Sequence, residues 1–90
     1  MYDFRLTDEL KVKIKKIIKK DKKKVEIINK KIKEIINNDS ITINRYKNLK
    51  YELKDLKRVH IDKHFVLVFN VENKNNLIRF INFDHHDNIY

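Results

Sequence analysis

The stretch Phe65-Val66-Leu67-Val68-Phe69-Asn70-Val71 contains the longest apolar run of this chain and decides the fold that we expect. Five consecutive apolar residues predict a strand with both faces buried, which belongs in the middle of a sheet. Before it, Lys57–Ile61 predicts a strand and Asp62–His64 a tight connection. After it, Glu72–Asn76 predicts a turn in which asparagines replace glycine, and Leu77–Phe83 predicts a third strand. The second half therefore predicts three consecutive strands.

The first half has the periodicity of two helices. A short strand is expected at Tyr2–Leu6, and Thr7 follows it as a helix N-cap with acidic residues in the first turn. Asp21 interrupts a lysine-rich run and can cap the second helix. That helix ends at 37–40, where an asparagine can take the left-handed conformation usually given to glycine. The apolar residues at helical spacing are Leu10, Ile14, Ile17 and Ile18, then Val25, Ile28, Ile32 and Ile35.

Together these elements predict an α+β fold with the order β-α-α-β-β-β. We expect a helical hairpin packed on one face of a small, mainly antiparallel sheet, with the other face open to a ligand. The segment Tyr46–Leu56 is mixed, and the alternation of Leu49, Tyr51 and Leu53 favours a strand over part of it. Ninety residues suffice for one domain, residues 1–90, and leave no room for a second.

The composition excludes several classes of function. The chain has 22 Lys and Arg against 13 Asp and Glu, a net charge of +9, and no Gly, Pro, Cys or Trp. Without Gly we expect neither a phosphate-binding P-loop nor a dinucleotide fingerprint, and without Cys neither a disulfide nor a thiolate metal site. The bias toward Lys, Ile and Asn indicates an AT-rich genome. The charged N-terminal region and the short apolar runs predict a cytoplasmic protein without a membrane role.

The positive charge falls into two groups. Seven of the ten residues in Lys15–Lys24 are lysine, which indicates either a solvated helix face or phosphate contacts. In the second half, cations alternate with aromatic residues, a pattern typical of single-stranded nucleic-acid binding by stacking and backbone capture. The cations that we expect to contact RNA there are Lys50, Lys54, Lys57, Arg58 and Arg79, and the aromatic residues include Tyr46, Tyr51, Phe65 and Tyr90.

The four histidines, His60, His64, His85 and His86, all lie at or after position 60, and the fold could bring them to one end of the sheet. Cleavage of RNA through its own 2′-hydroxyl needs a base, a cation and an acid, and no metal or other cofactor. His60 or His64, a nearby cation, and His86 with Tyr90 could fill these roles. Two alternatives stay open: ordinary surface histidines, or a zinc site formed by His60, His64, His86 and Asp87.

The second half also resembles a known family. Leu53–Tyr90 is similar to the RelE/ParE toxin superfamily, most closely to its YafQ-like branch. The resemblance rests on the segments Leu56–Ile61, Phe65–Phe69, Leu77–Phe80 and His85–Tyr90, the last of which contains His86 and Tyr90 at His-x-x-x-Tyr spacing. It implies a RelE-like microbial RNase fold over the whole chain.

The resemblance also implies an activity and partners. Such toxins are ribosome-dependent mRNA endonucleases that act in the ribosomal A site, and a RelB-type antitoxin neutralises them. The antitoxin is expected to bring an amphipathic helix and acidic residues. His60 and His86 correspond to catalytic histidines, and Tyr90 to the terminal aromatic residue that contacts mRNA. RNA contacts by Lys50, Lys54, Lys57, Arg58, Arg79 and His85 complete the expected site.

The chain departs from the family pattern at three places. His64 stands where YafQ-like toxins carry a catalytic Asp, Asn48-Leu49-Lys50 has no histidine to match theirs, and Val66 replaces an arginine of RelE-like members. Two other functions are therefore weighed beside mRNA cleavage. One is a ParE-like toxin that inhibits DNA gyrase and does not need the histidines. The other is a non-catalytic basic RNA-binding module, whose binding would depend steeply on salt.

Overall fold

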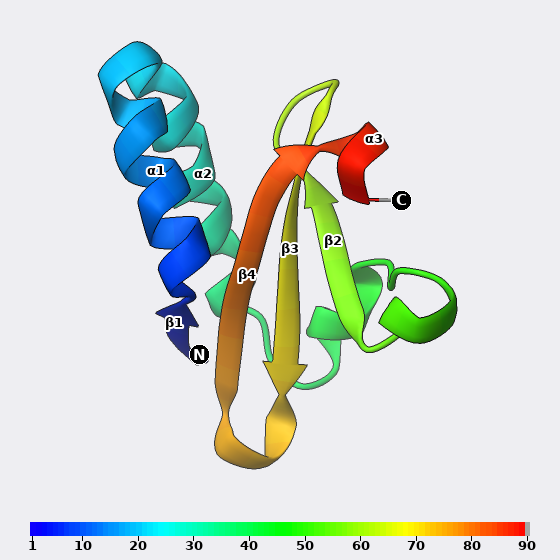
Figure 1. The fold of residues 1–90 in the computed structure, drawn as a ribbon. Helices are drawn as coiled ribbons and strands as arrows, with labels where there is room; N and C mark the ends of the chain where they lie inside the picture. The colour runs from blue at the N-terminus through cyan, green and yellow to red at the C-terminus, as the bar shows by residue number, and fades with distance from the viewer. Residues whose placement is uncertain (90) are drawn as a thin grey trace.

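The computed structural model describes residues 1–89 and confirms the predicted α+β order, with one more short helix after the last strand (Figure 1). Three 3-10 turns lie at Thr42–Arg45, Tyr51–Leu53 and Asn73–Asn75. The helices and strands are β1 Asp3–Leu6, α1 Asp8–Lys20, α2 Lys22–Ile36, β2 Leu56–His60, β3 Phe65–Glu72, β4 Leu77–His85 and α3 His86–Ile89. No helix within these residues has the length and apolar character needed to cross a membrane.

The sheet has the strand order β1-β4-β3-β2, so the apolar strand β3 lies between two neighbours as predicted. β3 pairs antiparallel with β2 and β4, whereas β1 pairs parallel with β4. The register between β3 and β4 shifts once: Val68 faces Asn82 and Phe69 faces Phe80, which leaves Ile81 without an opposite residue. Ile81 is therefore the extra residue of a β-bulge.

Both predicted helix caps are present. The Thr7 hydroxyl accepts from the Leu10 amide at 3.2 Å, and Asp21 Oδ1 accepts from the Lys24 amide at 3.1 Å. The predicted apolar stripe of α2 is buried along its whole length. On α1, Leu10 is buried but Ile18 is 45% exposed, because the C-terminal turns of α1 extend beyond the sheet (Figure 1).

The core lies between the helical hairpin and one face of the sheet, as expected. The edge-on contact of Tyr46 with Phe69, whose ring centroids are 5.6 Å apart, brings the segment after α2 into this core. Phe69 also packs on Phe80 of the neighbouring strand at 5.8 Å. The side chains without measurable exposure include Phe69, Phe80, Leu10, Ile28, Ile35, Ile43, Leu67 and Ile78.

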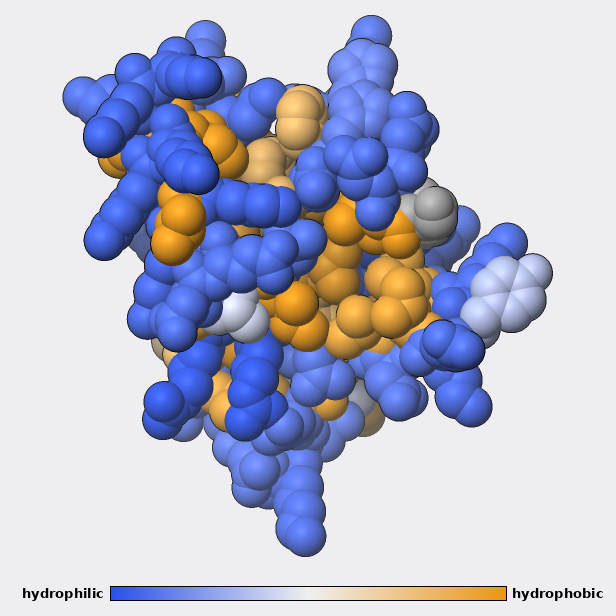
Figure 2. Space-filling view, in the orientation of Figure 1, coloured by the Kyte–Doolittle hydropathy of each residue, from blue (hydrophilic) through white to orange (hydrophobic). Residues whose placement is uncertain are grey.

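The second face of the sheet is more covered than we predicted. Val66 and Val68 alternate with the core residues of β3, so their side chains point to this second face, and both are buried. α3 lies against β3 and β4 there, and Leu49 is buried as well. Figure 2 shows the apolar surface that remains in the middle of this view, bordered by polar residues. The face is therefore open only in part.

Two local predictions were wrong. The segment 46–55 forms one 3-10 turn, Tyr51–Leu53, and a single bridge from Asn48 to Lys57 instead of a strand. The left-handed asparagine expected after α2 is absent, since Asn37 has φ −79° and the Asn38 side chain donates to the carbonyls of Glu34 and Ile35 instead. The asparagine prediction is confirmed at the β3–β4 turn, where Asn76 has φ 51°.

Candidate active site

Three of the four histidines meet at one end of the sheet. His64 lies in the turn between β2 and β3, His85 is the last residue of β4, and His86 is the first of α3. The ring centroids of His64 and His85 are 5.7 Å apart, those of His85 and His86 4.7 Å, and those of His64 and His86 6.5 Å. We call these three residues the histidine cluster. Its assembly follows from the pairing of Phe65 with His85 at the ends of β3 and β4.

The turn that carries His64 is fixed by Asp62. Asp62 Oδ1 accepts hydrogen bonds from the backbone amides of His64, at 2.8 Å, and Phe65, at 3.0 Å. The hydrogen bond from the His64 amide, with that from Phe65, holds the pKa of Asp62 below its usual range. The His64 carbonyl in turn accepts from the His86 amide at 2.8 Å. The backbone of the turn is therefore joined directly to the start of α3.

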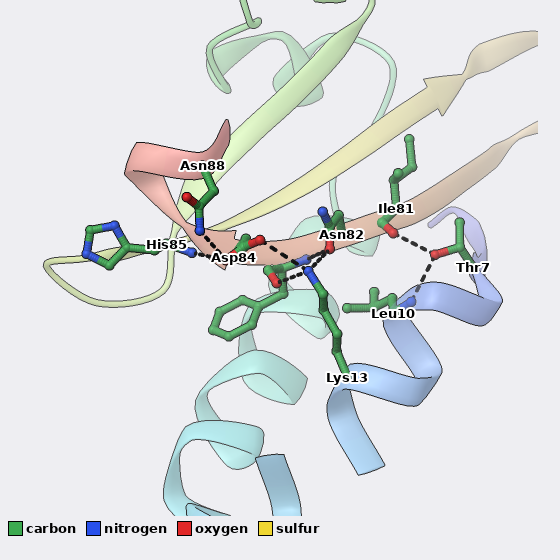
Figure 3. Close-up of polar contacts among 9 residues, drawn as sticks. Thr7, Leu10, Lys13, Ile81, Asn82, Asp84, His85 and Asn88 are labelled. Atoms are coloured by element: carbon green, nitrogen blue, oxygen red, sulfur yellow. Dashed lines mark hydrogen bonds and ion pairs between the residues drawn. The ribbon is translucent and has the colours of Figure 1, made fainter. Parts of the chain in front are cut away.

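Asp84 fixes the other two histidines (Figure 3). Its Oδ1 accepts from the His85 amide at 2.7 Å and from the Asn88 side chain at 3.1 Å, which ties the start of α3 to the end of β4. Its Oδ2 lies 3.3 Å from Lys13 Nζ of α1, which also donates to Asn82 Oδ1 at 2.7 Å. The hydrogen bond from Asn88, together with those from His85 and Lys13, lowers the pKa of Asp84. Helix α1 thus positions the histidine-bearing segment through Lys13.

The imidazoles of the cluster are open to solvent, and two of them lie beside the carboxylate of Asp87. The side chains of His85 and His86 are 36% and 37% exposed. His86 Nδ1 lies 3.0 Å from Asp87 Oδ1, while His85 Nδ1 accepts from the Asp87 amide at 3.2 Å. Imidazole nitrogens that are accessible and oriented in this way can act as general acids or bases.

Arg58 and His60 lie on the second face of the sheet. The cross-strand rows are His60–Val66–Asp84 and Arg58–Val68–Asn82, and directly opposed residues share a face. His60 thus occupies the row that ends at Asp84, beside the histidine cluster but not part of it. The position of Arg58 one row further along places a cation on the same face.

A shallow apolar groove lies between the segment before β2 and the last residue of α3. Its volume is about 350 Å³, and its lining residues are Leu49, Lys50, Tyr51, Glu52, Leu53 and Ile89. Tyr51 is 89% exposed and has φ 59°, a left-handed conformation that is costly for a side chain of this size. Strain at an exposed aromatic residue is a reason to look for a function there. The sequence placed Tyr51 among the aromatic residues of the RNA-binding pattern, but it did not predict the left-handed conformation or the groove beside it.

Comparison with known proteins settles the family. The whole chain is 49% identical, over 90 residues, to a Methanocaldococcus jannaschii protein named "Putative toxin RelE4", of which it covers 92%. The chain belongs to the RelE/ParE toxin superfamily. The 49% identity therefore confirms the resemblance inferred from the sequence. No family model matches the sequence.

Several solved structures share the fold of this chain. A metal-bound toxin from Helicobacter pylori has a TM-score of 0.79 at 17% identity, with both chains fully covered. YafQ from Escherichia coli has a TM-score of 0.74 at 17% identity and covers all of this chain and 99% of its own. YoeB in a YoeB–YefM complex from Staphylococcus aureus has a TM-score of 0.74 at 22% identity, covering 96% and 98%. These likenesses confirm the RelE-like fold.

The structure brings some of the predicted residues of this RelE-superfamily chain together and separates others. His64, His85 and His86 form the cluster, His60 and Arg58 lie beside it, and Lys50 lines the groove. Lys54 is exposed in the same loop. Tyr90 lies outside the described residues.

Lys57 and Arg79 are placed elsewhere. Lys57 Nζ donates to the Tyr46 carbonyl at 3.1 Å and to Asn48 Oδ1 at 2.7 Å, and burial lowers the pKa of Lys57. It therefore holds the segment before β2 in place. Arg79 forms an ion pair with Glu72 near the opposite end of β4. His85 lies six positions further along the strand, a distance of roughly 20 Å at about 3.3 Å per residue.

Proposed function

We propose that this chain is the toxin of a type II toxin–antitoxin pair and an endoribonuclease that cuts mRNA on the ribosome. Translation in the cytoplasm would then be its target. The observation that carries the proposal is the histidine cluster, in which His64 and His86 have ring centroids 6.5 Å apart and both face solvent. Two imidazoles at that separation can reach the same phosphodiester from different sides.

The reaction needs no group beyond side chains and the RNA. His64, or His60 in the neighbouring row, takes the proton of the 2′-hydroxyl as that oxygen attacks phosphorus. His86 gives a proton to the 5′-oxygen as its bond to phosphorus breaks. The products are a 2′,3′-cyclic phosphate and a 5′-hydroxyl. Arg58 would stabilise the charge that develops on the phosphoryl oxygens. We also propose that Tyr90, at the terminal aromatic position, contacts the mRNA.

RNA binding is assigned to the loop and strand around the groove. Lys50 and Lys54 lie on either side of the 3-10 turn that exposes Tyr51, so a base stacked on the phenol ring would have cations near its phosphates. His85 would add a contact at the cluster. The position of Lys57 supports a structural role. The position of Arg79 supports at most an indirect role in RNA binding.

The proposed partner is an antitoxin of the RelB or YefM type. The complex of YoeB with YefM from Staphylococcus aureus supports this assignment by analogy. This chain also has an apolar groove between β1 and α2, lined in part by Met1, Phe4, Leu6 and Ile36, in which Met1 and Phe4 are exposed. An amphipathic segment with acidic flanks would cover both the apolar groove and the neighbouring lysines.

The test is translation in vitro with purified ribosomes and a defined mRNA, read by primer extension. Wild type should produce codon-phased cuts, and His86→Gln should cut at least about 100-fold more slowly, since general acid–base groups contribute 10²–10⁴-fold. Lys11→Gln, at an exposed position of α1, is the matched control and should cut normally. Equal activity of wild type and His86→Gln would sink the catalytic assignment. Toxicity that survives a His60→Ala/His86→Ala double variant would favour gyrase inhibition instead.

A further inference from the structure

We propose that His64, His85 and His86 together bind one zinc ion, and that zinc in this position switches the proposed nuclease off. The regulatory half of the proposal rests on the proposed function, whereas the binding half does not. The zinc set considered from the sequence included His60 and Asp87 as ligands. In the structure, His85 takes the place of His60 among the nitrogen donors.

The spacing of the donors suits a metal ion. One ring nitrogen from each of His64, His85 and His86 lies within 4.8 Å of the other two. Tetrahedral zinc with Zn–N bonds of 2.0–2.1 Å needs nitrogens about 3.3 Å apart. The largest separation therefore has to shorten by about 1.5 Å, the difference between these two distances. Side-chain rotation can supply this, because His64 is exposed and the other two rings are about one third exposed.

The backbone that carries the three rings is already assembled. The His86 amide donates to the His64 carbonyl at 2.8 Å, and Asp62 and Asp84 hold the turn and the strand end on either side. Zinc binding would therefore order three side chains and leave the main chain in place. A site that needs little ordering loses less of its gross binding energy.

Asp87 supplies the outer carboxylate that zinc-binding histidines commonly have. His86 Nδ1 lies 3.0 Å from Asp87 Oδ1, so a proton on Nδ1 directs the lone pair of Nε2 away from the carboxylate. His85 Nδ1 accepts from the Asp87 amide at 3.2 Å and lies 3.4 Å from Asp87 Oδ2. When His85 binds through Nε2, its proton moves to Nδ1, where this carboxylate oxygen can accept it.

The local charge favours a cation although the chain as a whole carries +9. Asp62, Asp84 and Asp87 surround the histidine cluster. Lys13 pairs with Asp84, and Lys24 lies 3.8 Å from Asp62 Oδ2, so the carboxylate of Asp87 is left to balance the bound ion. Three neutral imidazoles select zinc-like ions and discriminate against Mg²⁺, which prefers oxygen ligands.

Inhibition follows from the chemistry of the donors. A lone pair that binds zinc can neither accept nor deliver a proton, and two of the three zinc ligands are the proposed acid and base. Zinc would thus compete with protons and with RNA for the same nitrogens.

The binding test uses full-length protein with a histidine-free affinity tag, dialysed against EDTA. Isothermal titration with ZnCl₂ should give one ion per chain, and MgCl₂ should give no heat of binding. His85→Gln should weaken zinc binding by at least about tenfold, because loss of even a hydrogen-bond partner of a metal ligand costs 10–100-fold in affinity. His60→Gln, one row away, should bind zinc as wild type does. Shifts of the His64, His85 and His86 ring protons in NMR spectra of wild type keep the test valid even if a variant misfolds. Absence of stoichiometric binding, or equal loss in both variants, overturns the site.

The activity test separates the two proposals. Metal-free protein should cut ribosome-bound mRNA, saturating zinc should suppress cutting by at least about tenfold, and EDTA should restore it. Stoichiometric zinc binding with undiminished cutting overturns the switch and leaves the nuclease standing. Zinc binding by a protein that never cuts overturns the nuclease, and with it the switch, but leaves the metal site standing.

Discussion

The Thr7 hydroxyl donates a 2.6 Å hydrogen bond to the carbonyl of Ile81, the bulge residue of β4, while it accepts one from the Leu10 amide. Because of the bulge, no residue of β3 lies opposite Ile81. The Thr7 hydroxyl provides the hydrogen bond to the Ile81 carbonyl (Figure 3). A single oxygen therefore joins the N-terminus of α1 to the point where β4 changes register. Beyond that point β4 continues to Asp84 and His85.

Removal of this hydroxyl should destabilise the fold. Thr7→Val keeps the shape of the side chain but loses both the cap and the bond to Ile81, and we expect a loss of about 1–3 kcal/mol in the free energy of unfolding. Urea denaturation followed by circular dichroism measures this change. Thr7→Ser retains the hydroxyl and should lose less. If the two variants are equally stable, the hydroxyl has no such role.

Lys13 should act as a positioning residue for the histidine cluster. Lys13→Met removes the bonds of Lys13 to Asn82 and Asp84. The side chains of Lys13 and Asp84 are about one third exposed, so the cost in stability should stay near or below about 1 kcal/mol. Amide hydrogen exchange of residues 84–88 should nevertheless become faster, and mRNA cleavage slower. Lys11→Met on the same helix is the control and should change neither. Unaltered exchange in Lys13→Met would refute the link between α1 and the cluster.

Acid should destabilise the protein through two carboxylates near the cluster. Backbone amides donate to Asp62, and Asn88, His85 and Lys13 donate to Asp84, so the pKa of each carboxyl is lower in the folded chain than in the unfolded chain. Their contribution to stability is complete above the ordinary value of about 3.9 and disappears as pH falls through the lower folded values. Urea denaturation between pH 6 and 2 at fixed ionic strength should show this loss, and Asp62→Asn should flatten it. A free energy of unfolding that stays constant across that pH range would contradict the predicted loss of stability in acid.

Tyr51 should separate stability from RNA binding. Tyr51→Gly relieves the left-handed conformation and should raise stability by up to about 1 kcal/mol, yet weaken binding of single-stranded RNA by roughly 1–3 kcal/mol through the lost stacking surface. Asn76→Gly is the matched control, since Asn76 is also left-handed but lies at the β3–β4 turn. It should leave RNA binding unchanged. Equal RNA affinity of Tyr51→Gly and wild type would remove Tyr51 from the proposed interface.

Arg58 and Arg79 should differ in their effect on cleavage. Arg58 shares a sheet face with His60 next to the cluster, whereas Arg79 pairs with Glu72 toward the other end of β4. We expect Arg58→Gln to slow cleavage about 100-fold, comparable to the loss of one donor to a developing oxyanion. Arg79→Gln should slow it less than about threefold. Single-turnover cleavage on programmed ribosomes measures both, and a reversed order would assign the phosphate contact to Arg79.

The sequence predicted those features that depend on local chemistry. Thr7 and Asp21 are caps because their side chains reach amides three residues later, and the apolar run of β3 has to be central because both of its faces need cover. Asn76 takes the left-handed turn because asparagine tolerates it and no glycine is present. These relations need no knowledge of distant residues.

The cluster itself was predicted only in outline. Which histidines meet depends on the register of β3 with β4, and the bulge at Ile81 that sets this register has no signature in the sequence. The four-residue helix α3 is too short to show periodicity, so the place of His86 beside His64 could not be predicted. The left-handed conformation of Tyr51 could not be predicted either, because a tyrosine in the sequence does not indicate a positive φ.

The parallel pairing of β1 with β4 has a consequence for the order of folding. Asp3 pairs with Leu77 and Leu6 with Phe80, so the first strand has to wait for the last one before it gains a neighbour. Contacts between residues so far apart along the chain form slowly. During synthesis, β1 and the two helices therefore leave the ribosome before β4 exists to pair with β1. The proposed antitoxin would therefore meet a chain whose N-terminal strand is still unpaired.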